Sequence, residues 1–220
     1  MEAIDCITTR KSIRKFTDQP VSRELIMDVI RTAQQSPSYK NSQPWEVAVV
    51  SGDKKEGLSR LMIDLLATDT AATPDLAAPT SWPAPEQARI KELFQMRLEA
   101  TGIDLSAPAI IKKAKRANFS FYGAPLAVYL YQESSLSEWS LFDLGLFAQS
   151  LMLAAHGKGL GSVPQAFITD YSAEVKEYLG IPATKRLVLG LSVGYPDMES
   201  SVNKLTTSRA PAEEITTWFE

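Results

Sequence analysis

Hydrophobic residues recur at helical spacing along much of the chain. The first such face lies in residues 23–35 and consists of Ile26, Val29, Ile30 and Ala33. Ser22 precedes this face as an N-cap, and Pro37 follows it, so a helix is expected between them. The same reasoning predicts helices after Asp53, over 86–101, over 139–156 and around 172–179.

Three short runs predict strands instead. They are residues 45–50 (WEVAVV), 126–132 (LAVYLYQ) and 186–193 (RLVLGLSV). The middle run is almost continuously apolar, which is typical of a strand at the centre of a sheet. Helices and strands in this order indicate a mixed three-layer domain.

Two segments depart from simple amphipathic patterning. The segment 139–156 is apolar over most of its circumference, so this helix is expected to be buried, either in the core or against another subunit. Residues 67–85 are rich in Ala, Thr and Pro, a composition typical of a mobile excursion.

Composition excludes several classes of function. The chain has 220 residues, a net charge of −3, one Cys and one His. Nucleic-acid binding as the main activity is therefore not expected, and neither is a disulfide, a zinc site or a catalytic triad through His156. No uncharged stretch reaches the ~18 residues of a membrane span, and acidic residues near the start do not suit a signal peptide. We expect a cytoplasmic protein that acts on a small molecule, with no membrane partner.

Residues 10–16 (RKSIRKF) form the densest polar cluster. If this segment is extended, Arg10, Ser12 and Arg14 share one face, and Lys11, Ile13 and Lys15 lie on the other. Such a face suits an elongated anionic ligand, but a solvated basic stretch has the same composition.

Two further segments are candidates for ligand contact. Residues 36–45 (SPSYKNSQPW) offer hydroxyls and amides between a helix and a strand, although a plain loop has the same residues. Residues 157–167 (GKGLGSVPQAF) let the backbone approach a flat ligand, or simply end a helix and continue as a loop. Neither a dinucleotide-binding G-x-G-x-x-G after a strand nor a Walker sequence occurs.

Taken in order, these segments resemble the nitroreductase family of FMN-dependent oxidoreductases. The resemblance rests on residues 10–14, 36–45, 123–125, 159–162 and 208–211. It implies an α+β, three-layer α/β/α fold with a central mixed, mainly antiparallel sheet. It also implies a homodimer of single-domain chains over 1–220, with a variable excursion at 67–118 and a C-terminal extension at 196–220 that packs on the partner subunit.

The resemblance also implies the binding residues of the FMN cofactor. Arg10, Lys11 and Ser12 would bind its phosphate and ribityl chain, and Arg14 would lie beside the N1/O2 edge of the ring and tune its redox potential. Further ligands would be Pro164, Gln165 and Ala166 along the ring, Arg209 at the phosphate, and Pro37, Ser38 and Asn41 from the partner. Thr207 stands where many members have Lys, which places more of the phosphate charge on Arg10, Lys11 and Arg209.

The implied activity is hydride transfer from NAD(P)H through FMN to an electron-poor acceptor such as a nitroaromatic or a quinone, by a ping-pong mechanism. No side chain need act as a nucleophile or metal ligand, because the flavin carries the redox chemistry. Alternatives are a reductive dehalogenase, a flavin-fragmenting enzyme and a non-catalytic flavin-binding protein.

The sequence does not decide which residues would cover the flavin. Phe119, Phe121 and Tyr122 precede Gly123 and could form a lid over the acceptor, or they could belong to the core. The basic residues 112–116 could attract an anionic acceptor or the phosphates of NADPH, or they could be a solvated helix face.

Overall fold

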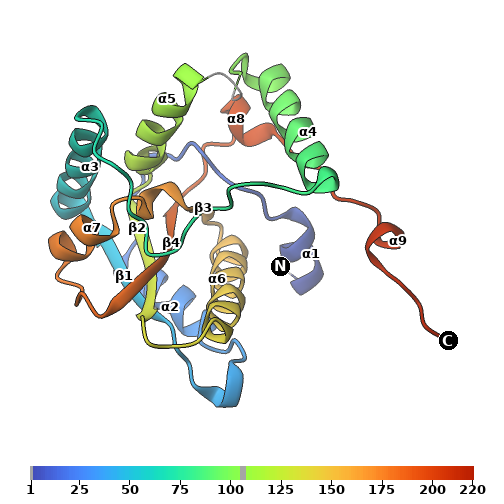
Figure 1. The fold of residues 1–220 in the computed structure, drawn as a ribbon, viewed down its shortest axis with the longest axis horizontal. Coiled ribbons are helices and arrows are strands. Elements are labelled where there is room, and N and C mark those ends of the chain that lie inside the picture. The colour runs from blue at the N-terminus through green and yellow to red at the C-terminus, as the bar shows by residue number, and fades with distance from the viewer. Residues whose placement is uncertain (1, 105–107) are drawn as a thin grey trace.

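A computed structural model describes residues 2–104 and 108–220 (Figure 1). The helices are α1 (Ala3–Thr9), α2 (Arg23–Ala33), α3 (Gly52–Ala67), α4 (Ala84–Thr101), α5 (Pro108–Phe119), α6 (Trp139–Gly157), α7 (Ser172–Leu179), α8 (Ser201–Lys204) and α9 (Ala212–Ile215). The strands are β1 (Glu46–Ser51), β2 (Leu126–Glu133), β3 (Gly161–Gln165) and β4 (Lys185–Gly194). Short 3-10 turns are η1 (Tyr39–Asn41), η2 (Phe121–Gly123) and η3 (Phe167–Thr169).

The four strands form one sheet in the order β1-β2-β4-β3, and each pair of neighbours is antiparallel. A parallel element is supplied by the isolated bridge between Ser12 and Ser162. The predicted central place of 126–132 is confirmed, because β2 pairs on both sides. The α+β class is confirmed as well.

The residues of β2 alternate between two hydrophobic cores. Leu126, Val128 and Leu130 pack with α2 and α6 on one face of the sheet. Ala127 and Tyr129 pack with α3, α5 and α7 on the other. This alternation follows from the period of two of a strand, and it explains why a central strand is apolar on both faces. Figure 1 shows these helices on the two sides of the strands, which gives the three layers.

A register shift lets β4 serve both cores. Leu130 pairs with Leu189, but the next residue, Tyr131, pairs with Leu187, so Val188 is an extra residue on β4. The bulge reverses the facing of the strand. Leu187 accordingly belongs to the core on the α3 side, whereas Leu191 belongs to the core on the α6 side.

The helix predicted at 23–35 is confirmed with its cap. The Ser22 hydroxyl accepts a hydrogen bond from the backbone N–H of Leu25 at 3.1 Å, which satisfies one of the free donors of the first turn. The four residues of its predicted apolar face are buried: Ile26, Val29, Ile30 and Ala33.

Two expectations need correction. Residues 161–165 form the edge strand β3 instead of a loop, because the backbone there pairs with β4 from Gly194 to Gly190. The segment predicted as a mobile excursion lacks helix and strand over residues 68–83 but is anchored in its middle. Asp75 accepts hydrogen bonds from Lys176 Nζ and the backbone N–H of Leu187, both at 2.8 Å.

Helix α6 has one face in the core and one face exposed. Leu144, Phe147 and Leu151 are buried, whereas Trp139 and Phe142 are 66% and 61% exposed. The C-terminal segment, from α9 onward, leads away from the rest of the chain (Figure 1). It exposes three large hydrophobic side chains, those of Ile215, Trp218 and Phe219. Among the described residues, none of the helices combines the length and the apolar character needed to cross a membrane.

Candidate functional site

The N-terminal and C-terminal segments enclose a cavity of about 850 Å³. Its walls come from the end of α1, the extended segment that follows, helix α4 and the segment after α8. The residues that line it are Ile7, Thr8, Thr9, Arg10, Lys11, Ser12, Arg14, Leu93, Arg97, Leu205, Thr206, Thr207 and Arg209. The basic cluster singled out in the sequence thus lines a cavity instead of facing only solvent.

Pairing with the edge of the sheet holds the basic segment extended. The backbone N–H of Ile13 donates to Ser162 O at 3.0 Å, and the side chain of Ile13 is 5% exposed. Gly161 makes this approach possible, because a Cβ built there would lie 2.7 Å from Ile13 Cγ1. The glycine-rich sequence at 159–161 therefore lets the basic segment approach β3 closely enough to pair with it.

The predicted alternation is correct in part. Arg10, Ser12 and Arg14 line the cavity, and Ile13 points into a small core cluster with Phe16. Lys11 was expected on the opposite face, yet it also lines the cavity. It lies directly after the end of α1 and before the Ser12 bridge, so the strand-like alternation does not reach it.

Asn203 fixes the backbone at Arg14. Its Oδ1 accepts from the N–H of Arg14 at 2.8 Å, and its Nδ2 donates to the carbonyls of Lys15 at 2.7 Å and Asp197 at 2.8 Å. The side chain is fully buried. Sequence reasoning missed this residue, because it lies in a stretch without periodicity that carries no signal of a buried amide.

The cavity is strongly cationic. Five of its lining residues are positively charged, namely Arg10, Lys11, Arg14, Arg97 and Arg209, and none of the lining residues is acidic. Burial, and then repulsion by Arg209, lower the pKa of Arg10. Its Nε is buried and, in the part of the chain that the structure describes, has no hydrogen-bond partner. A buried donor without an acceptor is costly, so an anion bound here would relieve both the repulsion and the missing hydrogen bond.

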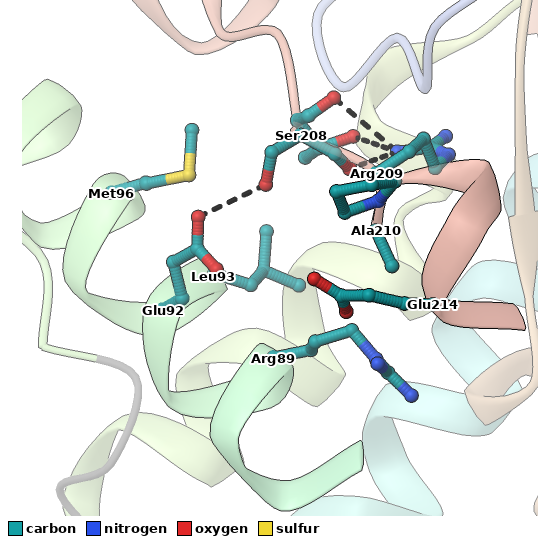
Figure 2. A pocket seen from close by; sticks show the side chains of 10 residues that line it. Arg89, Glu92, Leu93, Met96, Ser208, Arg209, Ala210 and Glu214 are labelled. Atoms are coloured by element: carbon teal, nitrogen blue, oxygen red, sulfur yellow. Dashed lines mark hydrogen bonds between the residues drawn. The ribbon is translucent and has the colours of Figure 1, made fainter. Parts of the chain in front are cut away.

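Arg209 lines both this cavity and a neighbouring one of about 420 Å³, which Figure 2 shows. Its Nη1 donates to Thr207 Oγ1 at 2.8 Å and to Ser208 O at 2.7 Å, and Ser208 Oγ donates to Glu92 of α4 at 3.0 Å. Thr207 therefore orients the arginine. Glu92 ties this segment to α4 at the same point.

The ring-contact candidates on β3 divide by exposure. Pro164 and Ala166 are exposed, whereas the Gln165 side chain is 2% exposed and points into the protein. Gln165 Nε2 donates to the backbone O and Oδ1 of Asn118 at 3.1 and 3.0 Å, and Ser192 Oγ donates to Gln165 Oε1. None of the three lines the cavity, and only Pro164 and Ala166 are exposed at the surface.

Pro37, Ser38 and Asn41 do not line the cavity either. Their loop packs against the start of α6, where the carboxylate of Asp143 accepts from the N–H of Tyr39 at 3.1 Å. Lys40 and Asn41 have positive φ values of 53° and 56°, which only a tightly held turn maintains in residues other than glycine. The loop is therefore a fixed, exposed feature away from this chain's own cavity.

The lid prediction is wrong for two of its three residues. Phe119 and Phe121 have no exposed surface and belong to the core on the α3 side, where Phe119 packs at 5.6 Å from the ring of Tyr171. Both side chains are buried in the apolar core beneath α5, and neither covers the cavity. Tyr122 is half-buried against the cluster of Ile13 and Phe16 and does not line the cavity.

Two of the four basic residues at 112–116 form ion pairs. Lys115 Nζ lies 2.6 Å from Asp170, and Lys112 Nζ lies 2.8 Å from Asp69. None of the four lines the cavity. Arg97, which does, was not singled out in the sequence; its position four residues after Leu93, on the same helix face, is the available signal.

The protein has a three-layer α+β fold, and its N-terminal and C-terminal segments meet around a cationic cavity. Such a cavity is typical of a protein that binds a phosphate-bearing or otherwise anionic ligand. Comparison with known proteins gives the family. The nitroreductase family model matches residues 7–195. The chain is 31% identical to a 4-nitrobenzoate reductase of Pseudomonas putida, over 96% of this chain and 92% of that one.

Solved structures agree. The FMN-dependent nitroreductase NfnB of Mycobacterium smegmatis, in complex with NADPH, superposes with a TM-score of 0.93 at 29% identity, over 99% of this chain and 98% of that one. The FMN- and NADPH-dependent NfnB of Sphigopyxis sp. strain HMH gives 0.93 at 27% identity over the whole of both chains. The chain belongs to the nitroreductase family.

Proposed function

We propose that this protein is an FMN-dependent oxidoreductase that passes reducing equivalents from NAD(P)H to an electron-poor acceptor, a nitroaromatic or a quinone. The observation that carries the proposal is the cationic cavity, whose charges and buried Arg10 Nε lack an anionic partner among the described residues. The FMN- and NADPH-dependent nitroreductases that the chain resembles support the same assignment.

The lining residues suit the parts of FMN. Arg10, Lys11, Ser12 and Arg209 would hold the phosphate, which carries about two negative charges at neutral pH and accepts several hydrogen bonds. The orphaned Arg10 Nε is the donor that this assignment satisfies. The exposed residues Pro164 and Ala166 would lie along the ring.

FMN, when bound, supplies the relay of a hydride between a nicotinamide and the acceptor. Arg14 would stabilise the negative charge that develops at the N1/O2 edge, because its backbone is held by Asn203 and its guanidinium faces the cavity. The cavity walls contribute hydroxyls and cations but no nucleophilic thiol or carboxylate, which suits chemistry carried by a cofactor.

The active form we propose is a homodimer. The accessible surface of the chain is 12841 Å², roughly 2,800 Å² more than the ~10,000 Å² expected of a compact monomer of this mass. Exposed hydrophobic side chains are found on the outer face of α6 and on the C-terminal segment after α9. A second copy would cover them, and its Pro37, Ser38 and Asn41 loop would complete the ring site.

Cytoplasmic residence is part of the proposal, because the reaction needs NAD(P)H and the single cysteine, Cys6, is a buried free thiol. The alternatives of dehalogenation and flavin fragmentation keep the same cofactor. No feature of the described cavity favours them over nitro-group or quinone reduction.

Reconstitution with FMN tests the proposed function. The FMN-loaded protein should be yellow and should oxidise NADPH or NADH only when an acceptor such as 4-nitrobenzoate or a benzoquinone is present. Acceptor-dependent oxidation with a halogenated phenol that exceeds the rate with a nitroarene would favour the dehalogenase reading. A protein that binds no FMN after removal of its own ligands would contradict the proposal.

A further inference from the structure

Arg97 brings a charge to the cavity from an element outside the basic N-terminal segment. It lies on α4, and the other residue that this helix contributes to the lining is Leu93. The two are four residues apart, so their side chains lie on the same face of the helix, one turn from each other. Helix α4 thus presents one apolar and one cationic side chain to the cavity.

Arg97 is half-buried. Within the part of the chain that the structure describes, its guanidinium makes no salt bridge and no hydrogen bond. Burial, and then repulsion by Arg14, lower its pKa, while Tyr122 acts in the opposite direction. Arginine remains charged at any physiological pH. Its charge is therefore held at an energetic cost that an incoming anion would offset.

The charges that FMN brings do not account for Arg97. The proposed function assigns Arg10, Lys11 and Arg209 to the phosphate, and these three cations already exceed its roughly two negative charges. Arg14 is assigned to the ring. Arg97 remains as a fifth cation in a cavity without an acidic lining residue.

The surroundings of Arg97 indicate the kind of anion. Ile7, Leu93 and Leu205 give the cavity apolar surface, so the ligand that fits has an apolar body as well as a charge. A planar guanidinium binds a carboxylate through two parallel hydrogen bonds. The basic residues of α5 are not candidates for this role, because none of them lines the cavity, and Lys112 and Lys115 already pair with Asp69 and Asp170.

We propose that Arg97 is a specificity-determining residue that binds the carboxylate of an anionic aromatic acceptor, with Leu93 packed against the acceptor ring. The inference rests on the proposed function. It predicts that the enzyme prefers nitroarenes that carry a carboxylate to neutral nitroarenes. It assigns a role to the variable helix α4 that the cofactor does not require.

The test compares Arg97→Gln and Arg97→Lys with Lys91→Gln, a control that removes an exposed cation from the same helix. Each FMN-loaded protein is assayed with 4-nitrobenzoate and with nitrobenzene, which lacks the carboxylate. Calorimetry measures the Kd of benzoate, which contains the carboxylate but cannot be reduced, and the Kd of FMN for the flavin-free protein.

For Arg97→Gln we expect kcat/KM for 4-nitrobenzoate to fall by about 10- to 100-fold through KM, with benzoate binding weakened in parallel. Nitrobenzene turnover and the Kd of FMN should stay within about twofold of the wild-type values, because neither depends on the carboxylate contact. Arg97→Lys should be intermediate, since it keeps the charge without the planar fork. Lys91→Gln should match the wild type.

Equal losses for the two acceptors would overturn the inference. So would a weaker Kd for FMN, which would assign Arg97 to the phosphate, or a higher KM for NADPH with unchanged acceptor preference. Benzoate binding that depends on Arg97, in a protein that reduces neither nitroarene, would keep the anion site and reject the proposed function.

Discussion

Arg14 is a single residue that contacts both the buried Asn203 and the cationic cavity. Its backbone N–H is bound by Asn203, and its side chain lines the cationic cavity. A fixed guanidinium raises the potential of a flavin by stabilising the charge of the reduced form.

We expect Arg14→Ala to lower the flavin potential by about 30 mV or more and to slow reduction by NADPH by about tenfold or more, since a hydrogen bond to a charged group is worth roughly 1.5–3 kcal/mol. Dye-equilibrated titration and stopped-flow absorbance measure the two quantities. Lys15→Ala, which removes an exposed neighbouring cation, is the matched control. An unchanged potential would show that Arg14 has another role.

His156 adds a pH dependence at the same end of the molecule. Its Nε2 lies 2.8 Å from Thr9 Oγ1, and burial, followed by the charge of Arg10, lowers its pKa. The unfolded chain takes up this proton near pH 6.5 and the folded chain only at lower pH. The unfolded state therefore binds more protons in that window, so the stability falls as the pH falls through it.

Urea unfolding of the flavin-free protein between about pH 7.5 and 5 measures this effect. The wild type should lose more stability on acidification than His156→Gln, which cannot take up the proton. Identical pH dependence in the two proteins would rule out the contribution.

At the scale of elements, the periodic segments followed from the sequence, whereas the residues of the site followed only in part. The face of α2 and the central place of β2 were predictable, because helical spacing and an unbroken apolar run each report burial directly. The edge strand β3 was not, because Gly161 and Pro164 lower its apparent strand propensity. Its pairing depends on β4 and on Ile13, both distant in sequence.

Phe119 and Phe121 show the same limit. An aromatic pair before a turn fits a lid or a core equally well in sequence, and only the packing of α5 on α3 decides for the core. The basic segment at 10–14 could be singled out in the sequence as a candidate site, and it lines the cationic cavity, whereas Asn203 could not, because a lone Asn acquires its role from tertiary contacts.

The contact of α8 with the basic segment gives a prediction at this scale. Asn203→Leu removes three hydrogen bonds and leaves the N–H of Arg14 without its acceptor. We expect a loss of about 2–4 kcal/mol in the free energy of unfolding and weaker FMN binding. Chemical denaturation and flavin titration measure the two effects. Ser201→Ala, an exposed change on the same helix, should alter neither.

The whole molecule has more accessible surface than a compact monomer of its mass should, and large hydrophobic side chains contribute to it. The outer face of α6 and the segment after α9 are separated along the chain, yet both expose large aromatic side chains. The dimer that we propose would bury both. Composition alone predicted a broadly apolar α6, but which part faces solvent depends on where α2 and the sheet lie.

Phe142→Asp tests the proposed dimer, because it places a charge on the exposed face of α6. Sedimentation should give twice the 24.2 kDa mass of the chain for the wild type and a large fraction of monomer for the variant. Ile111→Asp is the control, since this exposed residue lies on α5, on the other side of the sheet. A monomeric wild type would contradict the dimer.

Anaerobic stopped-flow absorbance of the FMN-loaded protein tests the central claim most directly. Mixing with NADPH should bleach the yellow absorption without any acceptor present. Subsequent mixing of the reduced protein with 4-nitrobenzoate should restore the absorption without further NADPH. Bleaching that nitroarene or quinone fails to reverse, or no bleaching by either NADPH or NADH, would contradict the assignment of this cavity to flavin-mediated reduction.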